Sequence, residues 1–549
     1  MRLFYIFMLL VFSLPLAAQE DWEGRGEIEE AEIIIEKDRK IVLPAASRVF
    51  EKMPPFELPK GKLGLEYTYL PVSFKPGSLN IRVRPLTIRT KPLAPVRIGN
   101  LKLGYGNYQT PFVEASLGNG RNDEYLYNVF LRHRSSATGP VDEKNSGDSE
   151  SQIDLRGSVY LNEATFSGGV NYQLDQYTFY GYDQSEDVLK SDIEQALNKF
   201  NLFGKIEKND PGNESNYSVN AVFDYVKDKY SATEADFGLN IFGSIKVNDQ
   251  LKADILADLY MINRKDASIT SYNRSFFRLK PYANYRMDRM HVDLGASIVF
   301  ENDTLGEDKS VRVFPYIHID FDINGSLQAF GGFKGDVDKM TLKTFLNKNR
   351  YLNANVDIFN QIRGFDFYAG VRGMFGGNWN YSIEADLSYF RNRAFFINDA
   401  ADTSKFIIIY DTESTSQNTF SASLGYDITK SINIGFLGEY FNYSTELVSE
   451  AWHEPAYNLE FTSSFIVGEK FKIKADAYLM GGIKSRDPTD GSTIALDAIT
   501  NIDIGLEYII SDRASIFGNT YNILGKSYQR YLFYGSRELQ WIAGLSYSF

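Results

Sequence analysis

Apolar and polar side chains alternate with a period of two along most of this chain, the pattern of β-strands with one apolar face. One segment places apolar residues at alternate positions, namely Leu251, Ala253, Ile255, Ala257 and Leu259. The positions between them are largely charged, namely Lys252, Asp254, Leu256 and Asp258. From residue 98 onward the alternation predicts 22 strands, near 98–105, 110–117, 125–133, 153–161, 164–172, 200–206, 217–225, 237–245, 251–259, 277–285, 291–300, 311–321, 327–333, 364–374, 381–389, 420–426, 432–441, 457–465, 471–479, 502–508, 514–521 and 539–549.

The connections between these segments alternate in length. Those after even-numbered segments are short, as at 247–250, 287–289, 324–326, 376–378, 429–431, 468–470 and 511–513. Those after odd-numbered segments are mostly long, as at 134–152, 183–199, 260–276, 334–363, 390–419, 442–456, 480–501 and 522–538. Tight turns at one end and long loops at the other are typical of bacterial transmembrane barrels. The sequence therefore predicts an all-β, antiparallel, up-and-down transmembrane barrel of about 22 strands over residues 98–549.

The last predicted strand ends the chain on an aromatic residue. Its apolar side chains stand at every second position, namely Leu539, Trp541, Ala543, Leu545, Tyr547 and Phe549. A strand of this length crosses a bilayer when it is tilted. The segment resembles the terminal strand of bacterial outer-membrane barrels, which the barrel-assembly machinery reads as a signal. That resemblance implies that Trp541, Tyr547 and Phe549 form an assembly signal and that the protein lies among outer-membrane lipids.

The first 97 residues have a different character. Residues 1–18 read as a signal peptide, with Arg2, an apolar stretch and a small-residue site before Gln19. Nine of the 17 prolines follow in residues 19–97, where they are poorly suited to a barrel wall because proline cannot donate to a sheet ladder. We expect residues 19–97 to form a periplasmic or lumenal segment. It serves as a reduced plug or as a docking arm.

Composition excludes several classes of function. The chain has no Cys, four scattered His and a formal net charge of -13, so it lacks a Cys-ligated or H-E-x-x-H metal site and is unsuited to nucleic acid. We find no nucleophile–base motif, and expect neither enzyme activity nor a cofactor. Aromatic residues make up 15% of the chain, as expected for girdles at two membrane interfaces.

The strand count and the closing sequence point to a family. The 22 segments and the stretch Asn522–Lys526 followed by Trp541–Phe549 resemble the barrel of TonB-dependent outer-membrane receptors, in a style similar to Bacteroidota proteins. The tetrad Glu32-Ile33-Ile34-Ile35 after an acidic lead resembles a Ton box, which implies TonB as a partner through strand pairing. The chain departs from the family because 79 residues are too few for the usual plug domain. A reduced plug, closing loops or a partner protein would have to fill the lumen.

Two hypotheses follow for the function. The first is solute uptake or passage through the lumen, lined by inward-facing polar residues, namely Lys252, Asp254, Asp258, His318, Asp320, Lys472, Lys474 and Asp476. The alternative is a non-transporting barrel that acts as a subunit or scaffold of an envelope-assembly or secretion complex. Helical spacing of apolar residues also predicts short helices within the loops, in 185–200 and 339–352.

Overall fold

The computed structural model describes residues 97–141, 143–208, 214–269, 271–303, 305, 310–429 and 431–549. The chain divides into two units, Met1–Thr90 and Lys91–Phe549, and all described residues belong to the second. The signal peptide, the segment 19–97 apart from its last residue, and the tetrad Glu32–Ile35 lie outside the described residues.

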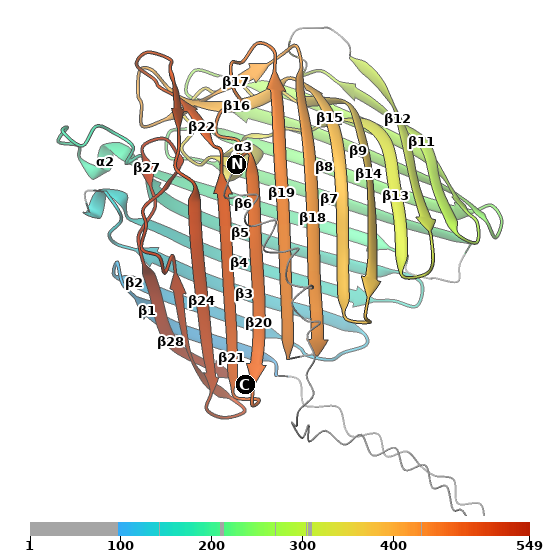
Figure 1. The fold of residues 1–549 in the computed structure, drawn as a ribbon, viewed down its shortest axis with the longest axis horizontal. Coiled ribbons are helices and arrows are strands. Elements are labelled where there is room, and N and C mark those ends of the chain that lie inside the picture. The colour runs from blue at the N-terminus through green and yellow to red at the C-terminus, as the bar shows by residue number, and fades with distance from the viewer. Residues whose placement is uncertain are drawn as a thin grey trace, which may run out of the picture. The chain divides into compact units, whose positions relative to one another are not determined.

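Twenty-two of the described strands form one antiparallel sheet (Figure 1). Their bounds are β1 Gly99–Gly106, β2 Thr110–Gly118, β3 Tyr125–Ser136, β4 Asp148–Tyr160, β5 Thr165–Thr178, β6 Glu194–Glu207, β7 Ser215–Lys227, β8 Thr233–Lys246, β9 Leu251–Lys265, β10 Tyr272–Arg286, β11 Met290–Glu301, β12 Val311–Asp322, β13 Leu327–Asp338, β14 Gln361–Phe375, β15 Trp379–Arg391, β18 Thr415–Thr429, β19 Ile432–Thr445, β20 Tyr457–Val467, β21 Phe471–Gly481, β24 Ile499–Ile509, β25 Ala514–Tyr521 and β28 Gln540–Ser548. The last strand, β28, pairs with β1 from Asn100↔Ser548 to Gly106↔Ile542. This pairing closes the sheet into a barrel without free edges.

The predicted fold class and strand count are confirmed, because each of the 22 predicted segments overlaps one strand of the barrel. Several strands extend further toward the long loops than alternation indicated. One of them, β4, already begins at Asp148, where Ser149 pairs with Gln176 of β5. These extensions carry polar residues on both faces, so hydropathy gives no signal for them.

Side-chain exposure in the barrel is the reverse of that in a soluble protein. Large apolar residues on the outer face are open, as at Val313 (67% exposed) and Leu545 (61%). Polar residues on the inner face are covered, as at Asp293, Asp320 and Ser546. An outer apolar band around a polar interior is the arrangement that a bilayer requires.

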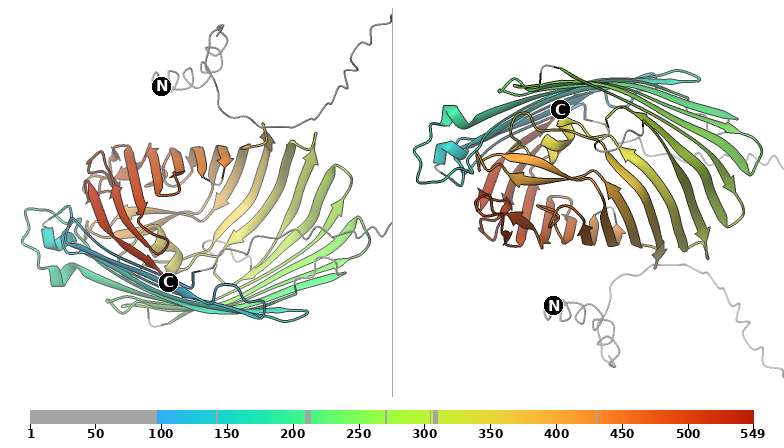
Figure 2. Two further views of the ribbon diagram at one scale, coloured as in Figure 1. Left: turned by 90° about the horizontal axis from the view of Figure 1, so that it is seen from below. Right: turned by 90° about the horizontal axis from the view of Figure 1, so that it is seen from above.

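The long loops contain the remaining elements, which lie at one end of the barrel (Figures 1 and 2). They are the hairpins β16 Arg393–Asn398 with β17 Phe406–Asp411, β22 Lys484–Arg486 with β23 Thr493–Ala495, and β26 Gln529–Tyr531 with β27 Tyr534–Gly535, and the helices η1 Glu143–Ser146, α2 Lys190–Ile193 and α3 Leu342–Lys348. None of the helices in the described residues is long and apolar enough to cross a membrane.

Each of the two segments predicted to be helical contains a helix, but the predicted extent is wrong for one of them. Helix α3 lies inside the predicted 339–352, where Thr341 accepts a hydrogen bond from the amide of Thr344 and caps its N-terminus. In 185–200 only Lys190–Ile193 is helical, and residues 194–200 belong to β6. They pair there with the loop end of β5, as at Leu197↔Asp175, so sheet pairing overrides the helical spacing.

Candidate functional site

The long loops pack together into a cap across one mouth of the barrel. An apolar cluster forms its core, with members from the strand ends, α3 and the β16–β17 hairpin, such as Tyr177, Leu197, Phe345, Phe396 and Phe406. Lys405 of the loop after β15 lies 5.3 Å from the ring centre of Phe179, in the loop after β5. These two strands are ten apart in the ring of 22, so the cap bridges nearly opposite walls. Figure 2 shows α3 inside the ring of strands.

A cavity of about 470 Å³ opens within this cap, between the loop ends of β4–β6, the segment after α3 and the β25–β28 loop. We call it the loop pocket. Six tyrosines line it, namely Tyr177, Tyr180, Tyr351, Tyr528, Tyr531 and Tyr534. Five cationic side chains also line it, namely Lys199, Lys348, Arg350, Arg530 and Arg537, against the two carboxylates Asp148 and Asp175. The lining therefore carries an excess of positive charge.

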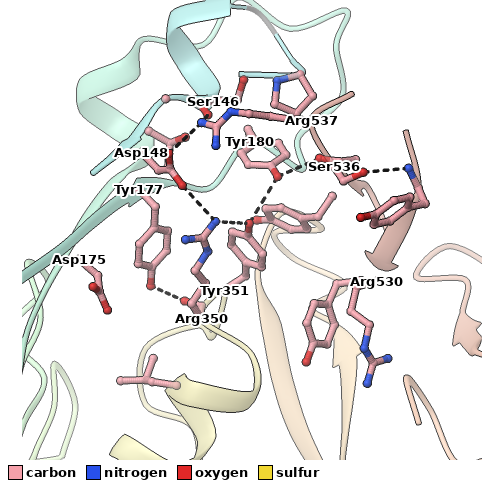
Figure 3. A pocket seen from close by; sticks show the side chains of 18 of the residues that line it. Ser146, Asp148, Asp175, Tyr177, Tyr180, Arg350, Tyr351, Arg530, Ser536 and Arg537 are labelled. Carbon is pink, nitrogen blue, oxygen red and sulfur yellow. Dashed lines mark hydrogen bonds and ion pairs between the residues drawn. The ribbon is translucent and has the colours of Figure 1, made fainter. Parts of the chain in front are cut away.

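Both carboxylates of the loop pocket are already engaged by cations. Arg537 donates to one oxygen of Asp148 at 2.9 Å, and Arg350 lies 3.9 Å from the other oxygen (Figure 3). Lys199 lies 3.0 Å from Asp175. Arg350 also stands 5.0 Å from the ring centre of Tyr177. Arg537 also donates to the carbonyls of Thr138 and Ser146, and Arg350 donates to the hydroxyl of Tyr351 at 3.2 Å. These contacts engage only part of the five N–H donors of each guanidinium, and the rest can serve an anionic ligand.

The tyrosines give the loop pocket a rigid aromatic wall. The rings of Tyr351 and Tyr534 are stacked with centroids 3.5 Å apart, and the hydroxyl of Tyr180 donates to the carbonyl of Gly535 at 3.1 Å (Figure 3). Burial raises the pKa of Tyr180 and of Tyr534, so both remain neutral phenols at neutral pH. Neutral phenols present ring faces and hydroxyl groups without adding negative charge.

The eight polar residues predicted to line the lumen lie on the inner face of the wall, away from the loop pocket. Lys472, Lys474 and Asp476 are exposed on that face of β21, and Lys472 lies 3.4 Å from Glu507. On β9, Asp254 is buried, Asp258 lies 3.3 Å from Arg278, and Lys252 is exposed. The β8–β9 register places these three β9 residues on the same side as Asp236, whose partner Lys339 belongs to the segment inside the barrel. None of the eight lines the loop pocket.

His318 and Asp320 belong to a square of two histidines and two aspartates on two neighbouring strands. In the register of β11 and β12, His291 faces Asp320 and Asp293 faces His318. His318 Nε2 is 3.1 Å from Asp320 Oδ2, and His291 Nε2 is 3.2 Å from Asp293 Oδ1. Across the described part of the chain, no group of three or more such side chains is arranged to hold a metal ion. The square thus forms a paired section of the lumen wall.

The three aromatic residues of the expected assembly signal lie at the closing seam. Trp541, Tyr547 and Phe549 stand on the exposed outer face of the C-terminal strand. The carbonyl of Phe549 accepts hydrogen bonds from the amides of Ile98 and Gly99 at 2.9 and 3.0 Å. The C-terminal residue therefore takes part in joining the two ends of the sheet.

Comparison with known proteins identifies the fold. A scan against protein-family models and a search of curated proteins each find no match. Many solved structures are similar, including the siderophore receptor PirA from Acinetobacter baumannii, with 12% identity, a TM-score of 0.63 and coverage of 84% of this chain and 81% of that one. The FrpB iron transporter from Neisseria meningitidis matches with 8% identity, a TM-score of 0.65 and coverage of 82% and 81%. The ferric-catecholate import receptor Fiu from K12 E. coli matches with 8% identity, a TM-score of 0.61 and coverage of 83% and 82%.

This chain has a TonB-dependent receptor-like barrel fold. The expected resemblance is thereby confirmed at the level of the fold. The closed barrel with its exposed apolar outer face agrees with the expected outer-membrane location. The proteins that match are receptors and transporters rather than enzymes. They do not favour the alternative of a non-transporting scaffold.

The loop pocket itself was missed by sequence reasoning. Its main residues come from segments without periodic hydropathy, and Tyr177 and Tyr351 are far apart in the chain. The only available signal was composition, because residues 528–537 contain three tyrosines and two arginines. Such a local enrichment marks a binding loop only when the fold is known.

Proposed function

We propose that this protein takes up an anionic, ring-bearing solute across the outer membrane, with the loop pocket as its first binding site. The observation that supports the proposal is the combination of five cationic side chains with six tyrosines in one cavity of the cap. Guanidinium groups bind carboxylates, phenolates and phosphates, and tyrosine rings pack against flat solutes. The similar structures include receptors for siderophores and for ferric catecholates, and ferric catecholates are anionic and aromatic.

Binding of a ferric tris-catecholate, measured by quenching of tyrosine and tryptophan fluorescence, tests this proposal. The double variant Arg350→Ala/Arg537→Ala removes two donors of the loop pocket. Charged hydrogen bonds are each worth about 1.5–3 kcal/mol, and solvent reduces that value here, so we expect at least a ~10-fold weaker affinity. Arg156→Ala is the matched control, because Arg156 lies further along β4 from Asp148 and does not line the loop pocket.

A neutral ferric tris-hydroxamate provides the second arm of this experiment. It has a similar size but lacks the negative charge, and we expect it to bind more weakly and to be unaffected by the arginine substitutions. Equal binding of both chelates, or an unchanged affinity in the double variant, would refute an anion-selective pocket. Transport is separated from binding by deletion of Glu32–Ile35, our proposed TonB contact. That deletion should stop cellular accumulation of the chelate without altering its affinity.

A further inference from the structure

The connection between β13 and β14 lies inside the barrel, and we call its residues 339–360 the lumenal strap. Its outgoing limb crosses the inner ends of successive strands. Lys339 pairs with Asp236 of β8, and Lys343 pairs with Asp224 of β7. Further along, Asn347 accepts a hydrogen bond from Lys199 of β6 at 2.9 Å, and the carbonyl of Arg350 accepts one from Tyr177 of β5. The outgoing limb thus contacts four successive strands, from β8 to β5, before the strap turns back.

The return limb follows the wall in the opposite direction and is fixed by buried groups. Arg264 of β9 donates to the carbonyl of Val356 at 2.5 Å, and Arg274 of β10 donates to that of Ile358 at 3.5 Å. Asn360 donates to Glu301 of β11 at 2.8 Å. Arg264 and Arg274 are 2% and 3% exposed, and each has a buried carboxylate partner, Asp266 at 2.7 Å and Asp303 at 2.8 Å.

The outgoing limb meets the wall through a polar seam instead. A cavity of about 220 Å³ separates α3 from the wall, and its lining is mainly polar, including Asp224, Asp236, Lys339, Lys343, Thr344 and Asn347. Both lysines of the seam keep part of their side chains exposed, 20% for Lys339 and 32% for Lys343. Asp236 itself is 6% exposed, but the lysine ends of both pairs reach solvent, so water can replace the lost partners when the limb lifts, whereas a fully buried charge that loses its partner is strongly destabilising. One buried hydrogen bond also crosses the seam, from the amide of Leu342 to Glu234 of β8 at 2.7 Å. The return limb has three such bonds, at Val356, Ile358 and Asn360, so the seam is the weaker of the two attachments.

Apolar packing joins α3 to the cap, in the buried cluster that also contains Leu197 of β6 and Val226 of β7. Phe345 is fully buried, and its ring lies edge-on to Phe396 of the β16–β17 hairpin with centroids 6.0 Å apart. A displacement of the cap would therefore draw α3 away from the wall along the polar seam. One apolar wall residue, Val226, lines that seam and is 1% exposed.

We propose that the lumenal strap gates the lumen, with its outgoing limb as the moving part and its return limb as the anchor. This inference rests on the proposed function, because the tip of the strap, Arg350 and Tyr351, forms one wall of the loop pocket. Opening separates α3 from β6–β8 and breaks the two lysine–carboxylate pairs. The contacts of Val356 and Ile358 stay in place.

Single reporter cysteines test the gate cleanly, because the chain has no cysteine of its own. Val226→Cys reports opening of the seam and Val356→Cys reports loss of the anchor, since both residues are buried. The rate of labelling by a membrane-impermeant maleimide is measured on the full-length protein in liposomes. We expect charge reversal by Lys339→Glu/Lys343→Glu to accelerate labelling of Val226→Cys at least tenfold and to leave Val356→Cys unchanged.

Two further variants keep the result interpretable. Adding Asp224→Lys and Asp236→Lys to the reversed pair restores opposite charges, and should restore protection of the reporter. Lys246→Glu is the matched control, because Lys246 pairs with Asp249 at the other end of the barrel. Heat-modifiable gel migration verifies folding of each variant. An unchanged rate at Val226→Cys, or equal acceleration at both reporters, would overturn the gate.

The charge-reversal arm needs no ligand, so it tests the gate even if the proposed solute is wrong. Ferric tris-catecholate is then added to the protein with native lysines. Faster labelling of Val226→Cys links the gate to the loop pocket. Binding without faster labelling separates the two and overturns the ligand-linked gate.

Discussion

Protonation of one buried histidine, His453, should open the cap at acidic pH. His453 lies in the loop between β19 and β20 and is 2% exposed. Its Nε2 is 3.1 Å from the hydroxyl of Ser485, and its Nδ1 is 3.4 Å from the carbonyl of Arg530. A carbonyl only accepts, so Nδ1 carries the proton and Nε2 accepts from the serine. One neutral imidazole thereby joins three loops.

Burial lowers the pKa of His453 from 6.5 to about 3, with the nearby Arg530 guanidinium adding to the effect. The closed cap therefore holds the neutral form, while an opened cap takes up a proton below pH 6.5. The stability that depends on this histidine is complete above pH 6.5 and is lost progressively as the pH falls toward 3. Below pH 6.5, each pH unit lowers the free energy of cap opening by about 1.4 kcal/mol. At pH 5 the closed cap is therefore less stable by about 2 kcal/mol, which is a roughly 30-fold rise in the opening equilibrium constant.

The neighbouring Trp452 is the reporter for this opening, because it is also 2% exposed. In a variant with the other three tryptophans replaced by phenylalanine, its emission should shift to the red between pH 6.5 and 4. His453→Asn is the matched comparison, since its amide supplies an N–H near the Nδ1 position. Asparagine also tolerates the positive backbone angle found there, φ 60°. Identical acid profiles for the two proteins would refute the assignment of acid opening to His453.

Two further predictions concern the wall. Gly544→Val should block barrel closure, because a Cβ at Gly544 would collide with the carbonyl of Leu103 in the paired strand β1. Gly518→Val, where the same atom meets open space, should fold, and heat-modifiable gel migration distinguishes them. Leu545→Lys places a charge on the outer face and should cost about 2–4 kcal/mol in denaturant unfolding from bilayers. Asp476→Lys, on the inner face, should change stability by much less, and equal losses would contradict the assigned faces.

Sequence alone was sufficient for the wall, for a physical reason. A membrane strand must present apolar side chains to lipid at every second position, so Leu251 to Leu259 show their faces in the hydropathy pattern. Glycine-rich and charged turns such as 324–326 then set the strand order, because consecutive strands pair. Side-chain contacts on the inner face are harder to predict from the sequence. The hydroxyl of Tyr368 on β14 lies 2.7 Å from a ring nitrogen of His318 on β12. This contact depends on the register of three successive strands.

The cap could not be predicted in the same way. Tyr351 and Tyr534 stack although 182 residues lie between them in the chain, because barrel closure brings the β25–β28 loop beside β5. Nor does local sequence distinguish a loop that projects outward from the strap that folds inward. That choice depends on tertiary partners such as Asp236 and Asp224, whose carboxylates receive Lys339 and Lys343.

The geometry of the cap also constrains how binding and gating can be related. Arg350 and Tyr351 follow the C-cap of α3, Asn349, and both line the loop pocket. Leu346, Asn347 and Lys348 of α3 line the pocket as well, so a displacement of α3 moves one wall of the pocket. A ligand that contacts this wall then has different affinities for the open and closed states, and a difference in affinity is the condition under which a ligand shifts such an equilibrium. By reciprocity, charge reversal in the seam should change the affinity of the loop pocket even though none of Lys339, Lys343, Asp224 and Asp236 lines it.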